Sequence, residues 1–153
     1  MTFFAAVLTN PSFSCSEAFG PPAPVITLLD KQNAFAALAA KLIHRAQATG
    51  YQVSLGEAWR TPEQAKFTIE QVLLNAQKGT GIASSLHIKR LALDLNLFHN
   101  GKYLAASSDY EELGKWWEAQ STGQGPNSIR CTWGGRFKKP DGNHFSIEHE
   151  GIR

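Results

Sequence analysis

Leucines alternate with small or polar residues between positions 91 and 98, and this is the clearest pattern in the chain. Side chains of a strand alternate between two faces, so the leucines share one face and Asp94 lies on the other. A carboxylate is costly to bury in so apolar a strand unless a cation or hydrogen bond pairs with it. A metal ion would serve, and His87, at the entry to the strand, is a candidate second ligand.

Apolar residues at helical spacing predict a first helix from Asp30 to Thr49, with Asp30 as its cap. Gly50 then ends it. The stripe that we expect to face the core consists of Phe35, Leu38, Leu42 and Ala46.

A short strand, Tyr51–Trp59, is predicted next from the alternation of Val53 and Leu55. Thr61, Pro62 and Gln64 then form the pattern of a capping box with proline at the first helical position. This pattern predicts a second helix that continues to about Gln77 and places Arg60 at a strand-to-helix corner. By position alone, Arg60 can equally be an ordinary surface arginine.

The second half of the chain reads as further strands around one helix. Asn100 and Gly101 favour a tight hairpin turn after the leucine strand. Ser108 and Glu111 predict a capping box for a helix that bears Tyr110, Leu113 and Trp117. Two strands follow, Cys131–Trp133 and His144–Glu148; in the second, Phe145 and Ile147 would face the core and His144 the other side.

Composition indicates one soluble domain. The chain has 153 residues, of which 42% are hydrophobic and 18% charged, and a net charge of +2 gives no reason to expect nucleic acid as a partner. Its two cysteines form neither a disulfide framework nor a cysteine zinc site. The apolar start lacks a basic residue and is short, so we expect residues 1–25 to be a flexible leader and residues 26–153 a single domain, without stable membrane insertion.

The candidate chemistry gathers on a few of these residues. Two imidazoles and a carboxylate, from His87, His144 and Asp94, suit zinc and leave a fourth position for water. Asp141 precedes His144 across a tight turn and could exchange a proton with that water, and Arg60 could stabilise the oxygen of an attacked carbonyl. By spacing alone, a hydrolytic metal site is one interpretation among several.

Four segments together carry a resemblance to a known family. Ser85, His87, Ala92 and Asp94 match the pattern S-x-H-x-x-x-x-A-x-D of zinc peptidases that cut peptidoglycan peptides. The segments Glu57–Gln64, Trp133–Gly135 and Asp141–Phe145 resemble that family's arginine corner, W-G-G strand and D-x-x-H-F close. The family includes D-Ala-D-Ala carboxypeptidases and phage-type L-alanyl-D-glutamate endopeptidases. Two departures are Trp59, where tyrosine is usual, and Ser146, where glutamate often follows.

The resemblance implies an α+β fold of the hedgehog/DD-peptidase type, a small antiparallel sheet with helices packed on one side. It implies one Zn²⁺ held by His87, Asp94 and His144, with Asp141 as general base and then acid, and Arg60 as the oxyanion ligand. Gln64 and Ser85 match motif positions and would place substrate or support the site.

From this resemblance we expect a zinc metallopeptidase of the endolysin type, from a prophage lysis cassette, that cleaves the L-alanyl-D-glutamate bond of the peptidoglycan stem peptide. The alternatives are a D-alanyl-D-alanine carboxypeptidase and a non-catalytic zinc-containing module that binds the cell wall. We expect a monomer that accumulates in the cytoplasm and depends on a holin to reach the cell wall.

Overall fold

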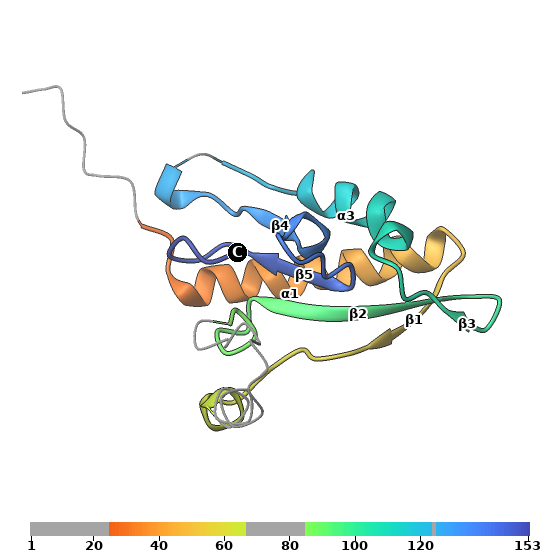
Figure 1. The fold of residues 1–153 in the computed structure, drawn as a ribbon. Coiled ribbons are helices and arrows are strands. Elements are labelled where there is room, and N and C mark those ends of the chain that lie inside the picture. Colours follow the sequence, from red (N-terminus) through yellow and green to blue (C-terminus); the bar gives the residue numbers. More distant parts are fainter. Residues whose placement is uncertain (1–24, 67–84, 124) are drawn as a thin grey trace, which may run out of the picture.

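A computed structural model describes residues 25–66, 85–123 and 125–153 of the chain. Its centre is the long strand β2, Ala92–His99, in a five-stranded sheet of order β1-β2-β5-β4, with β3 also paired to β2 (Figure 1). All the pairings are antiparallel. The sheet is open and is combined with helices, so the predicted α+β class is confirmed.

The leucine face of β2 forms the middle of the core, as predicted. Leu91, Leu95 and Leu97 are fully buried and Leu93 nearly so. Strand β1, Gln52–Leu55, pairs with the second half of β2, and β3, Lys102–Tyr103, returns from a hairpin whose Asn100 and Gly101 both have positive φ. The expectation for β1 was partly wrong, because it is shorter than Tyr51–Trp59 and Leu55 is 61% exposed at the edge of the sheet.

Helix α1, Leu28–Ala48, lies along the core with Phe35, Leu42 and Ala46 buried. The predicted cap was wrong by three residues. Thr27 is the N-cap, and Asp30 completes the capping box from inside the first turn by accepting from the Thr27 N–H. The helix ends before Gly50, which has a positive φ, as expected.

Helix α3, Glu111–Glu118, follows the 3-10 helix η2, Ser107–Tyr110. The capping box expected at Ser108 and Glu111 was wrong, because the chain turns earlier and the Asp109 carboxylate accepts from the Ala106 N–H instead. Tyr110 is buried, donating to the Leu104 carbonyl and accepting from the Leu97 N–H, and this fastens the start of α3 to β2.

The last third of the chain supplies β4, Cys131–Trp133, and β5, His144–Ile147, each close to its predicted range. Short 3-10 helices, η3 at Gly125–Asn127 and η4 at Gly134–Arg136, flank β4. All four residues of β5 are buried, since β5 lies between β2 and β4 in the sheet.

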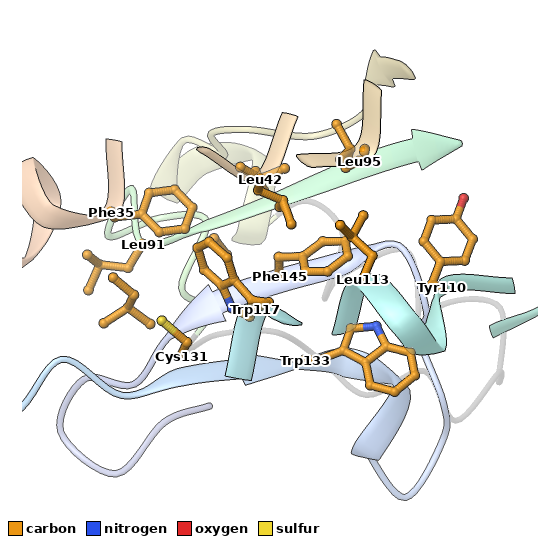
Figure 2. Close-up of a cluster of buried hydrophobic side chains, with 14 of the residues drawn as sticks. Phe35, Leu42, Leu91, Leu95, Tyr110, Leu113, Trp117, Cys131, Trp133 and Phe145 are labelled. Carbon is orange, nitrogen blue, oxygen red and sulfur yellow. The ribbon is translucent and has the colours of Figure 1, made fainter. Parts of the chain in front are cut away.

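Helices α1 and α3 meet the sheet in one core. The Trp117 ring lies edge-on to Phe35 of α1 and Phe145 of β5, with ring centroids 6.1 and 6.0 Å away (Figure 2). The Trp117 indole N–H donates to the carbonyl groups of Thr132 and Ser146, so a polar atom is satisfied inside the core. Among the described residues, no helix has the length and apolar character needed to cross a membrane.

Two predictions fall largely outside the described residues: the flexible leader, and the continuation of the second helix beyond residue 66 to about Gln77. The start of that second helix is described and confirmed. Thr61 Oγ1 accepts from the Gln64 N–H at 3.1 Å, and Gln64 Oε1 accepts from the Thr61 N–H at 2.8 Å, so the capping box is formed.

Candidate metal centre

The pairing of β2 with β5 places two of the candidate ligands beside each other. In the register of these strands Asp94 lies opposite His144, and both side chains project from the face opposite the buried leucines. Side chains of directly opposed residues are close neighbours in an antiparallel sheet. The pairing of β2 with β5 therefore brings together two of the three predicted ligands.

The third ligand comes from a compact turn that leads into β2. Successive hydrogen bonds between backbone groups close this turn, from the Ile88 N–H to the Ser85 carbonyl and from the Arg90 N–H to the His87 carbonyl, both at 3.1 Å. Ser85 is buried, and its Oγ accepts from the His87 N–H at 3.3 Å. Ser85 thus supports the backbone of His87, and its role in the site stays a prediction.

Three donor atoms of this cluster converge. His87 Nε2 lies 3.2 Å from His144 Nδ1, His144 Nδ1 lies 3.2 Å from Asp94 Oδ1, and His87 Nε2 lies 3.4 Å from the same oxygen. Ligand atoms of a tetrahedral zinc ion, with bonds of about 2.0–2.1 Å, are separated by about 3.3–3.4 Å. The spacing of the cluster therefore fits one zinc ion, and its nitrogen and oxygen donors are the kinds that zinc takes.

The electrostatics of the cluster keep Asp94 ionised. Burial alone would raise the pKa of Asp94, but hydrogen bonding to His144 and His87 and attraction to both rings outweigh it and lower the pKa to about 2. His87 Nδ1, which carries the ring proton when Nε2 binds a metal, is buried and has no hydrogen-bond partner in the described part of the chain. The Asp94 carboxylate is thus ionised and available as a ligand.

Arg60 is held against the cluster by Glu57. Its Nε donates to Glu57 Oε1 at 2.7 Å and its Nη2 donates to Glu57 Oε2, a forked pair whose arginine side chain is only 15% exposed. The hydrogen bonding to Glu57 raises the pKa of the guanidinium against the effect of burial. Nη1 is buried and has no hydrogen-bond partner among the residues described.

The backbone ties the same segment to two of the metal-ligand candidates. The Arg60 N–H donates to the His87 carbonyl at 3.4 Å, and the Asp94 N–H donates to the Glu57 carbonyl at 2.8 Å. Gly56 allows this close approach, because a Cβ there would lie 3.0 Å from Asp94 Cβ. Our reading of the sequence missed Glu57; an acidic residue three positions before an arginine is too common a spacing to reveal a side-chain pair.

A cavity of about 660 Å³ opens over the cluster and brings most of the candidates together. Its lining includes all three metal-ligand candidates, Ser85 and Arg60, and also Asp141. Asp141 is exposed, and its carbonyl accepts from the His144 N–H at 3.2 Å, so the expected turn is present. Gln64 is not part of this lining. Its side chain caps the helix that begins at Pro62, and its role in placing substrate stays a prediction.

A family model described as D-alanyl-D-alanine carboxypeptidase matches residues 78–147, a range that contains all three metal-ligand candidates and Asp141. The resemblance that the motifs indicated is confirmed. The match supports a peptidase acting on peptidoglycan as the general class of the protein.

Among solved structures, the chain is similar to the crystal structure of Serratia marcescens L-Ala D-Glu endopeptidase ChiX. The sequences are 19% identical, the match covers 74% of this chain and 79% of that one, and the TM-score is 0.48. No curated protein sequence matches this chain.

Proposed function

We propose that this protein is a zinc-dependent peptidase that cleaves the L-alanyl-D-glutamate bond of peptidoglycan stem peptides. The observation that carries the proposal is the convergence of His87 Nε2, His144 Nδ1 and Asp94 Oδ1 within 3.2–3.4 Å of one another at the floor of an open cavity. Three protein ligands from separate elements leave a further coordination position free, which is the arrangement of catalytic rather than structural zinc sites.

Zinc bound there would act as a Lewis acid and lower the pKa of water. The chain's own residues would do the remaining work. Asp141 takes a proton from the attacking water as its oxygen bonds to the peptide carbon, and returns the proton to the leaving amine as the carbon–nitrogen bond breaks. Arg60 donates to the carbonyl oxygen while negative charge develops on it.

The shape of the cleft favours an endopeptidase. The cavity over the cluster adjoins a second one of about 460 Å³, and the two share Phe137, Lys138 and Arg153, so a chain could extend past the cluster on that side. An endopeptidase needs such room on both sides of the bond that it cuts. The alternative is a carboxypeptidase that releases terminal D-alanine, which the description of the matching family favours.

The test is to incubate the purified, zinc-loaded protein with muropeptides, with and without a chelator, and to identify the products by mass. We expect new L-alanine carboxyl ends and D-glutamate amino ends that disappear with chelator and in an Asp141→Asn variant. A Glu112→Gln variant, which removes a carboxylate from the exposed side of α3, should cleave normally.

Three other outcomes would change the proposal. Release of terminal D-alanine alone would replace the endopeptidase with the carboxypeptidase. A folded protein that holds zinc, measured by elemental analysis, and cleaves nothing would leave a module that binds the cell wall. Binding of less than one zinc per chain, unchanged by His87→Ala and His144→Ala, would contradict the metal site.

A further inference from the structure

The cleft continues beyond the metal cluster into a second cavity with a different lining. This cavity, of about 460 Å³, lies along β4 and the segment after it, and includes Trp133, Arg136, Phe137 and Lys138. Phe137 also lies against the ring of His144, with centroids 5.5 Å apart, so it stands between the cluster and the second cavity. A substrate bound over the cluster would therefore enter the second cavity by passing Phe137.

The floor of the second cavity is rigid. Trp133 is only 4% exposed, and its indole N–H donates to the Gly142 carbonyl at 2.7 Å. Gly114 and Gly135 both press on this ring, since a Cβ at either position would come within 2.1 and 2.2 Å of it, respectively. The shape of this floor is thus set before any ligand arrives, which reduces the entropy lost on binding.

The charge at the rim of the second cavity is mainly positive. The side chains of Arg136, Lys138 and Arg153 contribute cations, whereas Glu118 is the one acidic side chain among the lining residues described. Glu118 accepts from Nε and Nη2 of Arg136 at 3.4 and 3.3 Å, and the same guanidinium lies 5.6 Å from the centre of the Trp133 ring. This exposed pairing leaves Nη1 of Arg136 outside the contact with Glu118.

We propose that the second cavity is a carboxylate-binding subsite, in which Arg136 and Lys138 take up a free carboxylate of the peptide substrate at a distance from the bond that is cut. The inference rests on the proposed function for the class of substrate. A stem peptide offers this chemistry from two sources, an acidic side chain and the terminal carboxylate. Guanidinium and ammonium groups at the rim of a preformed pocket are suited to such a group.

Binding can be measured without turnover. Zinc-loaded protein carrying Asp141→Asn is titrated by calorimetry with a synthetic stem peptide in three forms: with all carboxylates free, with the side-chain carboxylate amidated, and with the terminal carboxylate amidated. Adding Arg136→Gln should weaken binding of the free peptide about tenfold, as expected for the loss of one charged hydrogen bond. One of the two amidated peptides lacks the carboxylate that the subsite recognises, and Arg136→Gln should not weaken binding of that peptide further. The peptide that is unaffected therefore identifies the source of the carboxylate.

Arg130→Gln is the matched control. Arg130 is also an exposed arginine, and it pairs with Glu148 at 3.3 Å, but it lines neither cavity. The subsite is contradicted if Arg136→Gln and Arg130→Gln weaken binding equally, or if Arg136→Gln weakens all three peptides alike. Absence of cleavage by the wild-type protein would instead defeat the proposed function, while the calorimetric comparison would still decide whether the cavity binds carboxylates.

Discussion

Among the single residues, Glu57 fixes the position of the Arg60 guanidinium. An arginine side chain has several rotatable bonds, and a lone one at the rim of a cavity would lose much entropy on meeting a substrate. The forked contact with Glu57 removes that freedom in advance and leaves Nη1 as the nitrogen outside the pair. Under the proposed function, Glu57 would therefore act as a positioning residue, through Arg60.

Replacing Glu57 with glutamine keeps one acceptor but removes the charge and half of the fork. We expect Glu57→Gln to lower kcat about 10–100-fold with little change in KM, because a charged hydrogen bond contributes about 1.5–3 kcal/mol. Steady-state kinetics on a stem peptide measures both constants. The control is Glu63→Gln, at an exposed position in the first turn of the helix that begins at Pro62.

A double-mutant cycle separates positioning from general damage. In an Arg60→Ala background, Glu57→Gln should have no further effect on kcat, because the group that it positions is gone. An equal loss in both backgrounds would mean that Glu57 acts on another part of the protein.

Cys131 gives a second prediction at this scale. Burial raises the pKa of its thiol to about 11, although a hydrogen bond with Ser121 opposes the shift. At pH 8 only about one thiol in a thousand is then ionised, compared with about a quarter for an ordinary cysteine. In a Cys15→Ser background, a thiol reagent should react slowly with the native protein and rapidly in urea. Fast reaction of the native protein would show that β4 opens readily.

Among the secondary-structure elements, helix α3 and strand β4 pack very closely together. Gly114 in α3 lies so close to the Trp133 ring that a Cβ would come within 2.1 Å of it. Helix propensity alone predicts that Gly114→Ala would stabilise the protein by about 1 kcal/mol. The steric clash should win, because neither the ring nor the backbone of α3 can move away.

We therefore expect Gly114→Ala to reduce the free energy of unfolding by about 1–3 kcal/mol, the usual cost of overpacking a core. Urea unfolding followed by tryptophan fluorescence measures it. Glu112→Ala on the exposed side of the same helix should change stability by less than about 0.5 kcal/mol. A stabilising Gly114→Ala would mean that α3 is not packed on Trp133 as described.

The elements also show which parts of the fold can be predicted from the sequence. Periodicity identifies β2, β5 and the buried stripe of α1, because an element that buries one face has apolar residues at a regular spacing within its own short segment of sequence. Helix starts are harder: Thr27 and Asp30 are both good capping residues, and the sequence alone does not choose between them. The Glu57–Arg60 pair and the β2–β5 register depend on contacts that the local sequence does not record.

For the whole molecule, zinc should stabilise the folded state, because the three ligands come together only there. At a zinc concentration about 100 times its dissociation constant, linkage gives about 2.7 kcal/mol, or an increase in Tm of about 5–10 °C for a chain of this length. Differential scanning calorimetry with and without chelator measures it. His87→Ala should abolish the increase, and His44→Ala, at an exposed position of α1, should preserve it.

The separation of the ligands along the chain has a further consequence. His144 is 50 residues from Asp94 and 57 from His87, so the cluster is incomplete until β5 has joined β2. A partly folded chain without that pairing offers at most two donors and holds the ion weakly. Contacts that form after the transition state change the rate of unfolding and leave the rate of folding almost unaltered. If β5 pairs with β2 only after the transition state, bound zinc would slow unfolding and so prolong the lifetime of the native protein. It would do little to increase the rate of folding.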